Sequence, residues 1–192
     1  MTTEKDNKLI IITAPSGAGK TSITRWLLAR YPQLSFSISA ATRQARAHEK
    51  NGVDYYFMSL DEFQQKIQHN EFAEWEMVYE GKYYGTLKSE LERIWSNGQT
   101  PVLDIEVKGA IHMQELYRGH ILSLFIEPPS VDELRRRLEG RGTESPESLY
   151  ARVNKASYEM SFKHHFDRII VNKELDLACR EADEAIKSFL GL

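Results

Sequence analysis

The stretch that most constrains the fold of this chain is Ala-Pro-Ser-Gly-Ala-Gly-Lys-Thr at residues 14–21. It follows the apolar run at residues 9–13 and precedes a segment with helical spacing of apolar residues, which is the strand, loop and helix order of a phosphate-binding P-loop. Backbone N–H groups wrap closely around phosphates in such a loop, and Gly17 and Gly19 can adopt backbone angles that a side chain disfavours. The sequence therefore predicts a site for a nucleoside triphosphate.

Each polar position of this loop has an expected role. We expect Lys20 to reach the β- and γ-phosphates and Thr21 to supply a hydroxyl to Mg²⁺, while the N-terminus of the following helix adds partial positive charge. The general pattern has glycine where this chain has Ala14, so the loop must turn there without a positive φ. The alternative interpretation is a glycine-rich turn with a stray lysine.

Composition bounds the class of protein. At 192 residues the chain suits one domain with inserted lobes, and 41% hydrophobic and 28% charged residues are ordinary for a globular protein. The net charge of −3 gives no global field that attracts nucleic acid. An anion site must therefore come from a local cluster such as Arg135, Arg136, Arg137 and Arg141. The single cysteine, Cys179, excludes an intramolecular disulfide.

Apolar patterning bears on location and partners. The start of the chain, Met1 to Lys8, lacks the apolar stretch of a signal peptide, and no later run approaches the ~18 apolar residues of a membrane span. We expect a cytoplasmic protein that acts on small-molecule substrates. No membrane, nucleic acid or obligate protein partner is expected.

Short apolar runs alternate with helical patterns along most of the chain, which predicts an α/β fold with a parallel sheet covered by helices. Ser59 with Glu62, and Ser130 with Glu133, are typical of capping boxes at helix starts. The predicted strands are Leu9–Thr13, Ser35–Ile38, Pro101–Ile105, Ile121–Ile126 and Arg168–Val171.

Two regions interrupt this alternation. Between Thr42 and Tyr84 a charged, tyrosine-rich stretch predicts an inserted lobe with short antiparallel strands. Between Glu127 and Ser145 a segment rich in Arg, Gly and Pro predicts a surface excursion.

Several motifs occur with the P-loop in one order and spacing: Ser37–Arg43, Gly52–Tyr55, Phe72–Trp75, Tyr83–Thr86 and Arg137–Thr143. Together they resemble the guanylate kinase family over nearly the whole chain. The resemblance implies transfer of the γ-phosphoryl group of ATP to GMP, and to dGMP, with Mg²⁺, for purine nucleotide metabolism and GMP recycling. It also implies a P-loop NTPase-type parallel sheet flanked by helices, in one domain of residues 1–192. Its parts are a core (about 1–38, 87–126 and 153–192), an inserted GMP-binding α+β lobe (about 39–86) and a helical lid (about 127–152).

The residues of the predicted lobe make chemical sense of this resemblance. Arg43 and Arg46 lie three residues apart, and a guanidinium pairs bidentately with phosphate oxygens in a way that an ammonium does not. Guanine presents two donors, N1–H and the 2-amino group, beside its O6 acceptor. The Glu74 carboxylate matches the two donors and the Thr86 hydroxyl matches O6. Adenine would instead leave the carboxylate facing the lone pair of its N1. The alternatives are lobe packing or solvated surface charge. By resemblance, the GMP-binding residues are Ser39, Arg43, Arg46, Glu49, Tyr55, Glu74, Tyr84, Thr86 and Glu106.

Asp104 and Glu106 follow an apolar strand, where α/β proteins place ligand-binding groups. We expect Asp104 to hold Mg²⁺ through water. The family usually has a second aspartate where this chain has Glu106, so that carboxylate contacts guanine or pairs with Lys108 instead.

The lid and the last strand complete the predicted donor side. Arg137 and Arg141 are four residues apart, so we expect them on one helical face, with Arg152 on the next helix; the alternative is a solvated basic helix. By resemblance, Asn172 contacts adenine. The resemblance assigns ATP binding to Ser16, Gly17, Ala18, Gly19, Lys20, Thr21, Ser22, Arg137, Arg141 and Asn172. Phosphoryl transfer is chiefly positioning and electrostatics, so the expected catalytic residues are Lys20, Arg43, Arg137, Arg141 and Arg152.

Two other functions share parts of this pattern. Guanylate-kinase-like domains of scaffold proteins bind phosphopeptides but characteristically lack a working P-loop, whereas Lys20 and Thr21 are present here. A P-loop kinase for another phosphorylated molecule, such as a ribose bisphosphate, would use the arginines but leave Glu74 and Thr86 without a purpose.

Overall fold

The computed structural model describes residues 7–140 and 146–192. The described chain divides into two compact units, one of residues 7–10 and 32–121 and one of residues 11–31, 122–140 and 146–192. Strand β1 (Leu9–Thr13) contributes to both units. Its first four side chains are fully buried, which explains why this strand is a continuous apolar run rather than an alternating one.

The predicted parallel sheet is confirmed. It has five strands in the order β2-β7-β1-β8-β9. Strands β2 and β7 pair in parallel, with Leu34 opposite Thr100, and β8 and β9 pair in parallel, with Leu124 opposite Arg168. The fold class is therefore α/β of the P-loop NTPase type.

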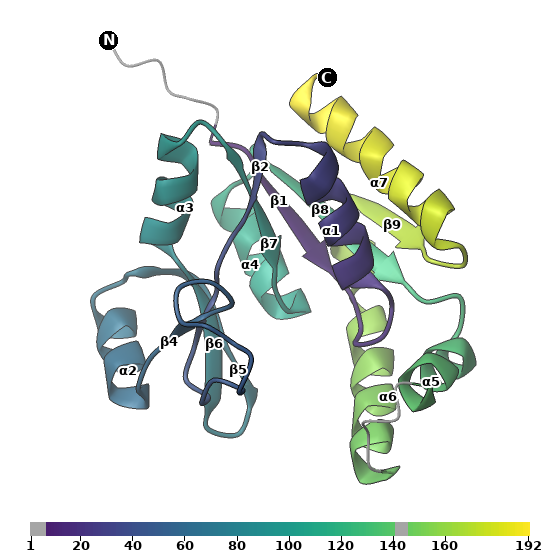
Figure 1. Ribbon diagram of the computed structural model, residues 1–192, viewed down its shortest axis with the longest axis horizontal. Helices are drawn as coiled ribbons and strands as arrows, with labels where there is room; N and C mark the ends of the chain where they lie inside the picture. Colours follow the sequence, from purple (N-terminus) through teal and green to yellow (C-terminus); the bar gives the residue numbers. More distant parts are fainter. Residues whose placement is uncertain (1–6, 141–145) are drawn as a thin grey trace. The chain divides into compact units, whose positions relative to one another are not determined.

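The first unit also contains a smaller sheet with the order β4-β3-β6-β5 (Figure 1). Helix α2 covers this sheet through a cluster in which the rings of Phe63 and Phe72 stack with their centroids 4.3 Å apart. The elements of this unit are β2 (Leu34–Phe36), β3 (Ala40–Ala41), β4 (Tyr56–Phe57), α2 (Leu60–Gln68), β5 (Phe72–Tyr79), β6 (Lys82–Leu87), α3 (Lys88–Ser96), β7 (Thr100–Asp104) and α4 (Val107–Leu116).

In the second unit, α1 and α7 lie side by side (Figure 1). Asp183 of α7 joins them, because its carboxylate accepts hydrogen bonds from the Tyr31 hydroxyl, from Arg30 Nε at 3.0 Å and from Lys187 Nζ at 2.7 Å. The elements of this unit are α1 (Lys20–Arg30), β8 (Ile121–Glu127, whose first residue belongs to the other unit), α5 (Val131–Glu139), α6 (Pro146–Met160), a 3₁₀ turn (Lys163–His165), β9 (Arg168–Val171) and α7 (Leu175–Leu190).

The predicted helix caps are confirmed. The hydroxyl of Ser59 accepts from the N–H of Glu62, and that of Ser130 accepts from the N–H of Glu133, each at 3.1 Å. These bonds satisfy N–H groups that have no partner within their own helices.

Two structural expectations need correction. The smaller sheet is not wholly antiparallel, because β3 pairs with β4 in parallel. Strand β2 ends at Phe36, and the N–H of Ile38 donates to the Glu90 carboxylate instead of a neighbouring strand. Within the excursion predicted between Glu127 and Ser145, residues 131–139 form α5, which buries Leu134 and Leu138 against α6.

Candidate functional site

The P-loop joins β1 to α1 as predicted. Gly17 and Gly19 both have a positive φ, 95° and 99°, whereas Ala14 is not among the described residues with positive φ. The N–H of Ala18 donates to the carbonyl of Pro15 at 3.0 Å, which closes the turn. Helix α1 begins at Lys20, so its first N–H groups face the end of the loop and favour an anion there.

Residues of α5 and α6 lie against this loop. A Cβ on Gly17 would stand 3.0 Å from a methyl group of Leu138, and Arg152 donates to the hydroxyl of Ser16 at 2.7 Å. Thr21 and Ser22 are exposed in the first turn of α1. The structure therefore brings a predicted lid arginine to the predicted ATP site.

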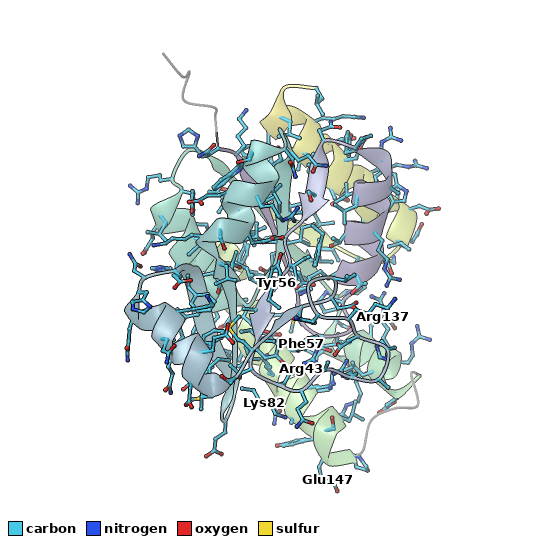
Figure 2. All side chains as sticks on the ribbon, turned by 60° about the vertical axis from the view of Figure 1, so that its left-hand side comes forward. Arg43, Tyr56, Phe57, Lys82, Arg137 and Glu147 are labelled. Carbon is cyan, nitrogen blue, oxygen red and sulfur yellow. The ribbon has the colours of Figure 1, made fainter. Side chains whose placement is uncertain are left out.

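Arg137 is the second lid arginine and extends from α5 (Figure 2). Its Nε donates to Glu133 at 2.8 Å and its Nη2 donates to the backbone carbonyl of Asn172 at 3.0 Å. Hydrogen bonds from Arg136 and Arg137 lower the pKa of Glu133 to about 2, so Glu133 is ionised at neutral pH. Helix α5 ends at Glu139, and Arg141 lies outside the described residues.

The smaller sheet carries a second group of predicted site residues. Arg43 Nη1 and Nη2 donate to the two oxygens of Glu49 at 2.6 and 2.7 Å, and Glu49 also accepts the N–H of Arg46 at 2.8 Å. The guanidinium carbon of Arg43 lies 4.8 Å from the ring centre of Tyr55 and 5.4 Å from that of Phe57. Figure 2 shows Arg43 beside Phe57. Glu49 therefore holds both terminal nitrogens of Arg43, and two aromatic rings lie within cation–π distance of the guanidinium.

Glu74 and Thr86 lie opposite each other on β5 and β6, and the Thr86 hydroxyl donates to Glu74 at 2.6 Å. Glu74 is 6% exposed, which is unusual for a carboxylate. Burial, together with the charges of Glu76 and Glu106, raises the pKa of Glu74 to about 7, against the opposing effect of the Thr86 hydrogen bond. A buried acid beside a hydroxyl is a polar site rather than a solvated surface charge.

Four further predicted residues take these positions. The carbonyl of Ser39 accepts the N–H of Tyr56 at 2.9 Å, and the rings of Tyr55 and Tyr84 meet edge to face at 6.1 Å. Asp104 ends β7, and Glu106 is the N-cap of α4 without a side-chain capping bond. Whether Glu106 turns to guanine or to Lys108 stays a prediction.

Sequence reasoning missed two residues that shape these sites. Gly109 of α4 leaves room for Glu74, because a Cβ there would stand 2.5 Å from Glu74 Oε2. Glu133 holds Arg137, and its place four residues before that arginine is a signal that the sequence does contain.

The parallel sheet, the P-loop after β1 and the arginines held beside that loop define a P-loop enzyme that acts on nucleoside triphosphates. The particular family follows from comparison with known proteins. A family model described as guanylate kinase matches residues 6–189, so the chain belongs to the guanylate kinase family, and it is an ATP:GMP phosphotransferase.

Relatives and a solved structure agree with this assignment. The chain is 50% identical over 185 residues to the guanylate kinase of Bacteroides fragilis, covering 96% of this chain and 91% of the relative. It is 45% identical over 186 residues to that of Salinibacter ruber, covering 97% and 98%. A crystal structure of guanylate kinase from Anaplasma phagocytophilum matches with a TM-score of 0.74 and 30% identity, covering 94% of this chain and 85% of that one. These matches favour the kinase over the phosphopeptide-binding and ribose bisphosphate alternatives.

The described residues contain no helix that is long and apolar enough to cross a membrane.

Proposed function

We propose that ATP binds at the P-loop of the second unit and that GMP binds on the smaller sheet of the first. The observation that carries the acceptor assignment is the buried Glu74–Thr86 pair. Its ionised carboxylate is proposed to accept the N1–H and 2-amino donors of guanine. The Thr86 hydroxyl, which donates to Glu74 in this structure, is proposed to turn and donate to O6 when guanine binds. The same carboxylate faces a lone pair in adenine, and this mismatch disfavours AMP.

The GMP phosphate is proposed to lie on Arg43 and Arg46, with the hydroxyls of Tyr55 and Tyr84 as further donors. This role for the Arg43 guanidinium is supported by its two hydrogen bonds to Glu49 and by its packing against Tyr55. Ser39 and Glu106 are proposed to border the guanine. Because all of these contacts fall on the base and the phosphate, the ribose 2′-hydroxyl is not needed, and we propose dGMP as a second acceptor.

The triphosphate is proposed to lie on the backbone N–H groups of residues 16–22, with Lys20 on the β- and γ-phosphates. Arg152 donates to Ser16 of this loop, and Arg137 donates to the backbone of Asn172. Together with Lys20, Arg43 and Arg141, these two arginines are proposed to balance the charge on the transferring phosphoryl group. Asn172 is proposed to contact adenine. No covalent intermediate is required.

Mg²⁺ is proposed to be held by the hydroxyl of Thr21 and, through water, by Asp104. Both are hard oxygen donors, which suit this ion. The described residues contain no cluster of three or more His, Cys, Asp or Glu side chains that could hold a metal. When bound, Mg²⁺ neutralises phosphate charge.

We also propose that residues 39–86 and 127–152 act as the lobe and the lid of one domain, and that the protein is cytoplasmic.

A coupled assay of ADP formation tests the acceptor assignment with GMP, dGMP, IMP, AMP, UMP and ribose phosphates. We expect turnover with GMP and dGMP, and Glu74→Gln should lose most of the preference for GMP over IMP and AMP. The matched control is Glu71→Gln, at an exposed residue three positions earlier. Equal turnover with GMP and AMP in the unsubstituted protein would contradict the assignment.

A further inference from the structure

Asn172 follows the last strand of the sheet and is only 5% exposed. Its backbone N–H donates to the carbonyl of Glu127 at 2.8 Å, which continues the pairing of β9 with β8. Its backbone carbonyl accepts from Arg137 at 3.0 Å. The main chain of Asn172 is therefore fixed at both of its polar atoms, and the side chain leaves from a rigid point.

The side chain of Asn172 contacts the P-loop at two neighbouring residues. Nδ2 donates to the backbone carbonyl of Ala18 at 2.7 Å. A Cβ on Gly19 would stand 2.1 Å from the same nitrogen, closer than any real Cβ contact. Gly19 is therefore required by this close approach as well as by its φ of 99°.

These contacts fix the peptide unit between Ala18 and Gly19. The described chain has no cis peptide bond, and in a planar trans peptide the C=O and the N–H point in opposite directions. Because Asn172 holds the carbonyl of Ala18, the N–H of Gly19 must point away from Asn172. That N–H is one of the donors with which a P-loop binds phosphate.

We propose that Asn172 is a positioning residue of the P-loop, whose amide orients the 18–19 peptide so that the Gly19 N–H faces the phosphates of the donor nucleotide. The inference rests on the proposed binding of ATP at this loop. It differs from the adenine contact because it predicts an effect on ligands that have no base. Since Arg137 bonds the backbone of Asn172, a change of the side chain removes the P-loop contact and keeps that arginine in place.

The test measures the binding of inorganic tripolyphosphate by calorimetry in the full chain and in Asn172→Asp. Aspartate has the same shape, but it replaces the donor with an oxygen that faces the carbonyl of Ala18. Losing one buried hydrogen bond predicts about tenfold weaker binding of tripolyphosphate, and a similar rise in KM for ATP. The KM for GMP should be unchanged. Asn172→Ala, which removes the donor without adding charge, provides the same reading if the aspartate variant does not fold.

The matched control is Asn97→Asp at the exposed end of α3, which should bind tripolyphosphate as the unsubstituted chain does. If Asn172→Asp and Asn172→Ala bind tripolyphosphate normally and only ATP more weakly, the residue acts on adenine and the inference is wrong. Failure of the proposed function has a different signature, because the unsubstituted protein would then show no GMP-dependent formation of ADP.

Discussion

Gly109 of α4 lies directly against the carboxylate of Glu74, so that a Cβ on Gly109 would stand 2.5 Å from Glu74 Oε2 and 3.2 Å from Cδ. The carboxylate has little room to retreat, since it is buried and its other oxygen accepts the Thr86 hydroxyl at 2.6 Å. A glycine in the first turn of a helix thus sets the place of the acid that is proposed to bind guanine.

Gly109→Ala should therefore displace Glu74. We expect the KM for GMP to rise by about tenfold to a hundredfold, as one or two polar contacts to the base are lost, with the KM for ATP unchanged. Steady-state kinetics with each substrate varied in turn measures both values. In a Glu74→Ala background the same change should have no further effect. An equal further rise in the KM for GMP in that background would show that Gly109 acts through something other than Glu74.

Binding of GMP should depend on pH through Glu74. The pKa of about 7 means that the empty protein holds a proton on Glu74 below pH 7, whereas the proposed guanine contact needs the carboxylate. GMP binding then releases a proton. The contribution of Glu74 should strengthen binding about fiftyfold as pH rises from 5 to 7, and it should level off above that.

Calorimetry in buffers of different ionisation enthalpy measures the proton release. The GMP phosphate titrates in the same range, so Glu74→Gln, which keeps that titration and lacks the carboxylate, supplies the correction.

The raised pKa of Glu74 also has a consequence for the stability of the folded protein. The unfolded chain loses this proton near pH 4.5 and the folded one near 7, so the contribution of Glu74 to stability falls between those values. Above pH 7, Glu74→Gln should unfold at a higher denaturant concentration than the unsubstituted protein, because it lacks the buried charge. A lower midpoint for this variant would contradict the raised pKa of Glu74.

Glu90 should be important for stability. This carboxylate is 2% exposed and accepts from the N–H of Ile38, the hydroxyl of Tyr56 and two nitrogens of Arg93, all at 2.8–3.0 Å. Glu90→Ala leaves these donors without their partner, so we expect the free energy of unfolding to fall by about 3 kcal/mol in urea titrations. Glu92→Ala, at an exposed residue of the same helix, is the control and should change it little.

The contribution of Glu90 to the stability of the folded protein should also decrease in acid. Burial opposes ionisation, but the bonds from Arg93, Ile38 and Tyr56 outweigh it and lower the pKa of Glu90 below its ordinary value. A carboxyl group with a lowered pKa stabilises the folded state at pH values above its ordinary pKa near 4.5. This stabilisation is lost as the pH falls through the lowered pKa. The difference in stability between Glu90→Gln and the unsubstituted protein should therefore shrink below pH 4, and a constant difference would contradict this explanation.

Glu49→Gln tests the orientation of Arg43. Glu49 holds both terminal nitrogens of the Arg43 guanidinium, so loss of its carboxylate should let the Arg43 side chain move. We therefore expect the KM for GMP to rise by about tenfold, with a smaller change in kcat. Glu80→Gln, at an exposed residue of the turn between β5 and β6, is the control. A lower KM in Glu49→Gln would mean that Glu49 competes with the phosphate for Arg43 instead of orienting it.

Local chemistry made much of this fold predictable. The apolar run of β1, the two serine caps and the glycines of the P-loop depend on residues a few positions apart, and the structure confirms them. The family resemblance supplied the site residues, and the structure brings Arg43, Glu49 and Tyr55 together, and Glu74 with Thr86.

Contacts between distant segments were not predictable in this way. Gly109 meets Glu74 across 35 positions of the chain, and the amide of Asn172 meets Ala18 across 154. Such pairs depend on how helices pack on sheets, and no periodic pattern encodes them. The parallel pairing of β3 with β4 was missed for a related reason, since strands of two residues carry too little alternation to reveal their direction.

Helix α1 is restrained at both ends, by the P-loop at Lys20 and by Asp183 of α7, which bonds Arg30 and Tyr31 at its far end. Its amide protons should therefore exchange with solvent only when α7 separates from it, so the two helices should open as one cooperative element. A phosphate-binding loop mounted on such an element retains its shape through the small local fluctuations that expose individual turns elsewhere.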